Sequence, residues 1–308
     1  MMRVFNITIV KFMRRRQILF LLFVWLFSFI LLLSQTKPTV EPLIINTLED
    51  ARFITVSPGG ITYVFEKARN AILKYSPAGE SLAIVSGFGL SKNNFTEPTD
   101  ICSPNDLDLF LSDYSNHRII QYDRSLNVNA IWQSDDQLVS RNNLFRYPKS
   151  IDVDHFGKLY LIDGENKRVV KITSSQKLER TFGGFDAGKG RLLNPKRIRV
   201  SNNGSVFVQD NDRILIYDQY GNYASTISND SINHIQSFCI FNTDLIIMDS
   251  CKLVRITIDG MIESMIRFKT IDWLNDLNEP VDIAFQNKKL YFLSPNKLIG
   301  LPINIIFK

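Results

Sequence analysis

Hydrophobic residues follow two different patterns along this chain. From Ile18 to Leu33 the run is almost continuously apolar, and Ser28 is its only polar residue. After residue 43 the apolar residues come in short runs that are rich in β-branched and aromatic side chains and are broken by Gly, Asn, Asp and Pro. Runs of this kind predict β-strands joined by turns. The pattern therefore predicts one N-terminal hydrophobic helix followed by an all-β body.

The N-terminal run has the features of a membrane-targeting segment. Arg14, Arg15 and Arg16 precede it, and no charge follows until Lys37. Basic residues of this kind stay on the cytoplasmic side of a membrane, whereas the apolar run enters the hydrocarbon. The run is shorter than the roughly 20 residues of a full span and lacks a small-residue cleavage site, so an uncleaved anchor and a cleaved signal peptide both stay open. We expect a basic cytoplasmic head at 1–16, a signal anchor or signal peptide at 17–35, and a linker at 36–42.

The body is built from repeats. A tetrapeptide that begins with Pro and ends with Ile recurs at 98–101, 148–151, 195–198 and 280–283. Each copy is followed by a second apolar run that ends in a polar residue, then by a polar turn and a third run. Alignment on six first-strand positions gives intervals of 47, 50, 47, 40 and 45 residues. These positions are Ile54, Ile101, Ile151, Ile198, Phe238 and Ile283.

Four-stranded units at this period are typical of the blades of a β-propeller. The sequence therefore predicts an all-β, six-bladed β-propeller over residues 43–308. The last repeat reaches the end of the chain near its third strand. Because an open sheet edge has to be paired, a fourth strand must come from elsewhere. We predict that residues 43–48 supply this closing strand to the last blade.

Two of the repeats resemble the NHL repeat. In 148–169 the pattern reads Pro-x-x-Ile, then Leu-Tyr-Leu-Ile-Asp, then Asn-Lys-Arg-Val, and 98–119 follows the same plan. The fourth repeat has a turn two residues shorter, and the first, fifth and sixth match weakly. The resemblance implies a six-bladed propeller. It implies no single activity, because the family includes RNA-binding modules, protein-interaction domains, receptor-kinase sensor domains and an amidating lyase.

The net charge of +5 does not describe the body. Residues 1–16 hold five basic residues and no acid, and the other 292 residues hold 31 basic and 31 acidic side chains. Nucleic-acid binding usually requires a strongly basic surface. We therefore expect no nucleic-acid partner, although a local basic patch balanced by acids elsewhere stays possible.

Polar residues recur near the start of the first strands, where the repeat register predicts the mouth of a central channel. We predict a ligand-binding site here. The same mixed set of charges and hydroxyls is also compatible with internal ion pairing that seals the channel. The candidate residues are Asp100, Ser150, Arg197, Ser237 and Asp282.

Other reactive side chains fit structural positions. Arginines at the start of third strands are expected to pair with acids at the end of second strands, as Arg118–Asp113, Arg168–Asp163 and Arg213–Asp210. His117 and His234 are expected on one face of the ring and His155 on the other, so the three cannot easily share a metal. We expect no metal, no cofactor and no catalytic residue. Cys239 and Cys251 belong to one repeat, and a bridge between them is left open.

These observations favour a non-enzymatic propeller, membrane-anchored or exported, that binds a protein, peptide or glycan outside the cytoplasm. One alternative is a hydrolase or lyase of the lactonase type with a metal site in the channel. The other is a sensor ectodomain that works with a partner chain.

Overall fold

The computed structural model describes residues 42–133, 145–275, 277 and 279–307. The predicted head at 1–16, the predicted membrane segment at 17–35 and most of the linker lie outside these residues. In the part of the chain that is described, no helix is both long and apolar enough to cross a membrane.

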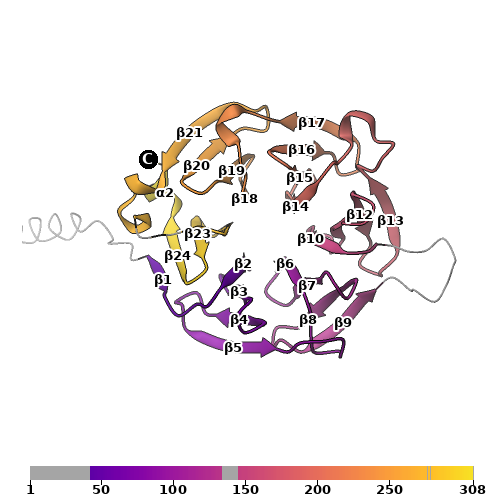
Figure 1. Ribbon diagram of the computed structural model, residues 1–308, viewed down its shortest axis with the longest axis horizontal. Coiled ribbons are helices and arrows are strands. Elements are labelled where there is room, and N and C mark those ends of the chain that lie inside the picture. The colour runs from indigo at the N-terminus through magenta and orange to yellow at the C-terminus, as the bar shows by residue number, and fades with distance from the viewer. Residues whose placement is uncertain (1–41, 134–144, 276, 278, 308) are drawn as a thin grey trace, which may run out of the picture. The chain divides into compact units, whose positions relative to one another are not determined.

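The body consists of six four-stranded antiparallel sheets arranged around a ring (Figure 1). Blades 1 to 3 are formed by β2 (Ala51–Val56), β3 (Thr62–Glu66), β4 (Ala71–Tyr75) and β5 (Ser81–Ser86); by β6 (Pro98–Cys102), β7 (Leu109–Asp113), β8 (Arg118–Tyr122) and β9 (Val128–Gln133); and by β10 (Pro148–Val153), β11 (Leu159–Asp163), β12 (Arg168–Ile172) and β13 (Leu178–Phe182).

Blades 4 to 6 follow the same order from the axis outward. They are formed by β14 (Pro195–Val200), β15 (Val206–Asp210), β16 (Arg213–Tyr217) and β17 (Tyr223–Ile227); by β18 (Ser237–Phe241), β19 (Asp244–Met248), β20 (Lys252–Ile256) and β21 (Ile262–Arg267); and by β22 (Asp282–Gln286), β23 (Lys289–Ser294), β24 (Lys297–Pro302) and β1 (Leu43–Ile45). The prediction of an all-β six-bladed propeller is confirmed.

The described residues of the body also contain four short 3-10 helices and one α-helical turn. They are η1 (Gly188–Gly190), η2 (Asp230–Ile232), η3 (Phe268–Thr270), η4 (Asp272–Leu274) and α2 (Ile303–Ile306).

The middle strands of each blade are buried on both sides. Every residue of β11 is buried, whereas exposed and half-buried residues alternate along the outer strand β5. This explains why the sequence of β11 is continuously apolar until its last residue. The core lies between neighbouring blades: Phe110 of blade 2, for example, packs in one cluster with Leu161 of blade 3.

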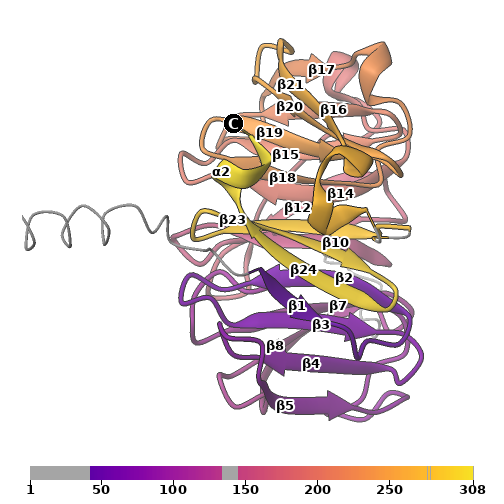
Figure 2. The same ribbon diagram turned by 90° about the vertical axis from the view of Figure 1, so that its left-hand side faces the viewer.

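The ring is closed by β1, which pairs antiparallel with β24 (Figure 2). Leu43 lies opposite Gly300 and Ile45 opposite Leu298. The strand covers 43–45 of the segment 43–48 for which it was predicted. Blade 6 therefore combines the beginning and the end of the described chain.

Recurrent acids at the ends of second strands hold the turns together. The predicted ion pairs are confirmed, with N–O distances of 2.9 Å for Arg118–Asp113, 3.0 Å for Arg168–Asp163 and 2.7 Å for Arg213–Asp210. The acids also accept N–H groups of the preceding interblade loop, as Asp113 does from Thr96 at 3.0 Å. These recurrent pairs therefore tie the turns of blades 2, 3 and 4 to the rest of each blade.

The turns define two faces of the ring. The side that carries the interblade loops and the turns between second and third strands is called the loop face. The turn face carries the turns between first and second strands and between third and fourth strands. His117 and His234 lie on the loop face, and His155 lies on the turn face. The backbone N–H of His234 donates to Asp212 in the β15–β16 turn at 2.9 Å, which places both residues on the loop face.

All three cysteines are free thiols. Cys102 and Cys239 are buried in β6 and β18, and Cys251 is exposed just before β20. The bridge that the sequence left open between Cys239 and Cys251 is therefore not formed.

Candidate functional site

The first strand of every blade is an unpaired sheet edge that lines the axis (Figure 1). Backbone N–H groups on such an edge need partners from outside their own sheet. Four of these strands, β2, β6, β10 and β14, also contain a register shift close to their first residue. Irregularities of this kind redirect side chains, and here they occur next to the polar residues predicted from the sequence.

The five predicted site residues are all buried, with exposures between 0% and 8%. They form two bonded groups. Asp100 accepts a short hydrogen bond from Ser150. Arg197 forms a short ion pair with Asp282 and donates to Ser237 at 2.8 Å, and Ser237 donates to Asp282 at 2.7 Å.

These side chains also bind the backbone of the next blade. Asp282 accepts the N–H of Ile54 at 3.0 Å, Asp100 that of Ile151 at 3.2 Å, and Ser150 that of Ile198 at 3.0 Å. The N–H of Ile283 likewise donates to Ser237 at 3.3 Å. The ring residues thus supply the partners that the exposed first-strand edges need. This geometry favours a sealing role, and ligand binding by these residues stays a prediction.

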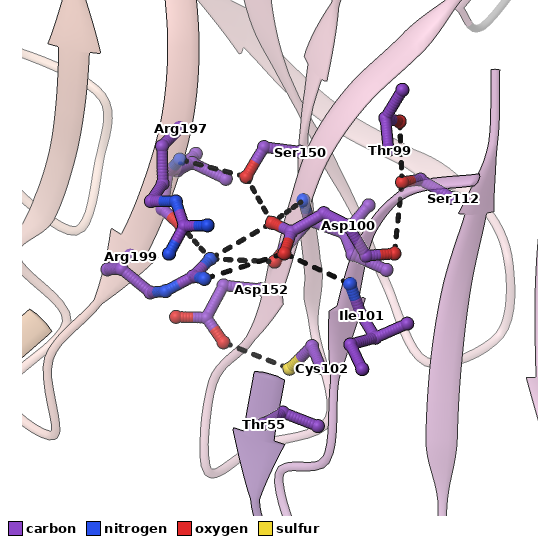
Figure 3. A network of polar contacts seen from close by, with 12 residues as sticks. Thr55, Thr99, Asp100, Ile101, Cys102, Ser112, Ser150, Asp152, Arg197 and Arg199 are labelled. Carbon is purple, nitrogen blue, oxygen red and sulfur yellow. Dashed lines mark hydrogen bonds and ion pairs between the residues drawn. The ribbon is translucent and has the colours of Figure 1, made fainter. Parts of the chain in front are cut away.

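A second polar layer, which the sequence reading did not assign to the site, lies next to the first (Figure 3). Arg199 pairs with Asp100 at 3.0 Å. Asp152 accepts the N–H of Val200 at 2.7 Å and the thiol of Cys102 at 3.1 Å. Both charged residues lie two positions after a predicted site residue on the same strand. Alternation along a strand was therefore the signal that could have identified them.

The pKa values of one carboxyl in each layer are shifted in opposite directions. Burial alone would raise the pKa of Asp100, but the guanidinium groups of Arg199 and Arg197 outweigh it and lower that pKa. Burial raises the pKa of Asp152, because Arg199 offsets the desolvation of this carboxyl only in part. Asp152 is therefore the channel carboxyl that takes up a proton more readily than an ordinary aspartate.

A small pocket opens beside the second layer. Its volume is about 210 Å³, and Arg199, Asp152, Cys102 and Cys239 contribute to its lining. A larger hollow of about 570 Å³ on the turn face shares Val200 and other first-strand residues with it. The described residues contain no group of three or more His, Cys, Asp or Glu side chains placed to hold a metal ion.

The loop face carries an aromatic cluster between blades 2 and 3. The ring centroid of Tyr147 lies 5.1 Å from that of Tyr114 and 4.2 Å from that of His117. The N–H of Tyr147 donates to Nδ1 of His117 at 3.3 Å. Tyr147 has a positive φ of 49° and is 36% exposed, so its ring is held at the surface next to the start of β10.

Three lysines follow this cluster toward blade 4. Lys149 and Lys196 hold equivalent positions in β10 and β14, and Lys167 lies in the turn between β11 and β12. The Lys149 chain runs over Gly164 of that turn, where an added Cβ would lie 3.2 Å from its Cγ and Cε. Burial, followed by the charges of Lys167 and Lys196, lowers the pKa of Lys149. Across the described ranges, none of these three lysines makes an ion pair.

Comparison by sequence gives a partial likeness to a known protein. No family model matches the chain. A stretch of 118 residues, 37% of this chain, is 25% identical to Protein brain tumor of Drosophila melanogaster, and it spans 11% of that protein. Membership in the NHL-repeat family therefore stays a prediction.

Comparison by structure decides the fold. A catalytically inactive variant of virginiamycin B lyase from Staphylococcus aureus, solved with quinupristin, superposes with a TM-score of 0.59 at 14% identity, over 84% of this chain and 99% of that one. A streptogramin B lyase gives a TM-score of 0.55 at 18% identity, over 80% of this chain and 77% of that one. The chain folds as a six-bladed β-propeller. At these identities the likeness extends to the fold alone.

Proposed function

We propose that the propeller is a binding module whose loop face holds an acidic peptide segment of a protein partner. The observation that carries this proposal is a set of three lysines that form no ion pair with any described residue, beside the aromatic cluster of Tyr114, His117 and Tyr147. These lysines are Lys149, Lys167 and Lys196. Lysines crowded together repel one another, and an anionic partner relieves that repulsion.

The aromatic cluster supplies the apolar part of the same surface. Tyr and His rings present both an apolar face and a polar group, and aromatic residues are enriched where proteins bind one another. Further along the loop face, Phe185 is 75% exposed and Arg191 lies over its ring at 4.2 Å. A peptide with carboxylates next to an aromatic or aliphatic side chain would match both features.

Peptide selection with the full-length chain tests this proposal. A random peptide library displayed on phage is selected against the protein, and the enriched peptides are measured by fluorescence anisotropy. We expect Asp and Glu to be enriched, and the affinity to fall by about tenfold or more in a Lys149→Glu, Lys196→Glu variant. The matched control is Lys177→Glu, Lys288→Glu, which makes the same charge change at exposed positions on the turn face.

Three outcomes would contradict the acidic-peptide proposal. The enriched peptides would carry no excess of acids, both double variants would weaken binding equally, or single-stranded RNA alone would bind the loop face. Salt adds a further check, because contacts between exposed charges weaken as ionic strength rises.

We also propose that the module works outside the cytoplasm, tethered or released through residues 17–35. This rests on the apolar run and the preceding arginines. A protease added to intact cells that produce the full-length chain should then digest the body. Protection of the body in intact cells, with digestion only after lysis, would contradict this location.

The lyase alternative rests on the fold and on the 210 Å³ channel pocket with its proton-prone Asp152. Metal analysis of the purified full-length protein distinguishes it, because stoichiometric calcium or zinc would favour a metal-dependent enzyme over a binding module. The sensor alternative predicts that a partner chain co-purifies with the protein from membranes.

A further inference from the structure

A second concave site lies at the outer rim between blades 5 and 6, away from the lysines of the loop face. We call it the rim pocket. Its volume is about 680 Å³, and its lining comes from β20, β21, the η3–η4 loop and the C-terminal turn α2. Figure 1 shows α2 on the same side of the ring as β21 and β24. Pockets of this size are common for small organic ligands.

The wall of the rim pocket carries the indole ring of Trp273. Trp273 is the middle residue of η4 and is 45% exposed. Its neighbours Ile271 and Leu274 are buried, at 7% and 1% exposure, in the core of blades 5 and 6. These two anchors hold the backbone at Trp273 beside the pocket, and the indole keeps much of its surface open.

The polar lining contains groups whose hydrogen-bonding capacity is not used. The Oγ atom of Ser264 is buried and has no hydrogen-bond partner. Arg255 lies opposite Ser264 in the β20–β21 register, and its Nε and Nη2 atoms bind Asp244 at 2.8 and 2.7 Å. Among the described residues its Nη1 atom has no partner. Buried polar groups without partners are uncommon in native structures, so the Oγ atom of Ser264 calls for a partner. The Arg255 side chain is 31% exposed, so its Nη1 atom is open to a ligand or to solvent.

Charge narrows the class of ligand. Asp244 neutralises Arg255, so the carboxylates of Glu263 and Asp272 leave the lining net negative and disfavour an anion. A simple ammonium ion can donate to these carboxylates but cannot accept from the guanidinium. A sugar hydroxyl both donates and accepts, and the C–H face of a pyranose ring covers an indole. We propose that the rim pocket binds a neutral sugar ring, with Trp273 as the stacking platform and Ser264, Arg255 and Glu263 as its hydrogen-bonding groups.

Titration of the full-length protein with methyl glycosides of glucose, galactose, mannose and N-acetylglucosamine tests the rim pocket. Saturation-transfer NMR detects contact, and calorimetry measures affinity. We expect saturable binding of at least one glycoside, a loss of about tenfold in affinity in Trp273→Ala and about threefold in Ser264→Ala. The control Tyr220→Ala removes an aromatic ring that is 61% exposed on the turn face and should leave affinity unchanged.

Thermal melts of each variant verify folding, and Trp273→Phe provides a second aromatic variant that should retain part of the affinity. The proposal is overturned if no glycoside binds saturably, or if Trp273→Ala and Tyr220→Ala bind alike. It is also overturned if N-acetyl amino-acid amides bind this pocket and sugars do not.

Discussion

Removing the buried side chains of β1 should open the ring. Leu43 and Ile45 are 8% and 5% exposed and pack in one cluster with residues of blades 1 and 6. The Leu43 side chain reaches the turn at Gly79, where an added Cβ would lie 2.7 Å from its Cδ1. The double variant Leu43→Ala, Ile45→Ala therefore removes contacts on both sides of the closure while keeping the backbone that pairs with β24.

The expected loss can be worked out from burial. Replacing a buried Leu or Ile by Ala costs about 2–5 kcal/mol, and these near-surface positions belong at about 2–3 kcal/mol each. The double variant should then lose about 4–6 kcal/mol, a large share of the roughly 5–15 kcal/mol that keeps a typical domain folded. For a body of this size, about 2–4 °C per kcal/mol corresponds to a Tm lower by about 10–20 °C.

Ile44 provides the matched control within the same strand. It is 38% exposed because alternation turns it away from the core. Ile44→Ala should cost no more than about 1 kcal/mol, which covers strand propensity and partial burial. Differential scanning calorimetry of the full-length protein measures both variants. Equal losses in the two, or an unchanged Tm in the double variant, would refute the view that β1 locks the ring through these side chains.

Three further predictions concern the channel, the loop face and a turn. Asp282→Ala should cost about 3–5 kcal/mol, because it leaves the guanidinium of Arg197 buried without its partner and the N–H of Ile54 without its acceptor; urea unfolding measures this. Lys149→Gln should weaken peptide binding without lowering Tm, because the lowered pKa of Lys149 means that folding disfavours its charged form. The stability of the natural protein should therefore rise with pH between that lowered pKa and the ordinary value near 10.5. The Lys149→Gln variant should lose this rise. Gly79→Ala should destabilise by about 1 kcal/mol or more in thermal melts, because φ is 88° there and the added Cβ meets the closing strand.

The strands and their order were readable from the sequence because each blade repeats the same local pattern. The outer strands 178–182 and 223–227 are bounded by residues that mark turns in the sequence, such as Gly183, Gly184, Gly221 and Asn222. The closing strand followed from a count, because the last repeat lacked one strand. The position at which this strand ends, Ile45, could not be predicted, because the length of the strand depends on how far β24 can pair with it.

The polar ring was readable only in part. Alignment of the repeats identified Asp100 and Arg197, which hold equivalent positions. It did not predict that Arg199 would pair with Asp100 from two blades away. Such a contact depends on how blades are placed around an axis and on register shifts in the first strands, and neither is written in local sequence. The lysines of the loop face were hidden for a simpler reason: the neutral total for 292 residues averages over a patch that forms only when blades 3 and 4 pack side by side.

The shared origin of blade 6 has a consequence for synthesis on the ribosome. Ile45 is synthesised more than 250 residues before its partner Leu298. Until then the first blade has an uncovered side, and the sixth cannot form a complete sheet. Contacts this distant in sequence slow folding, since the chain must close its longest loop before they form. Completion of the ring is therefore a late event in folding, and the interval before it is when the chain most needs protection from aggregation.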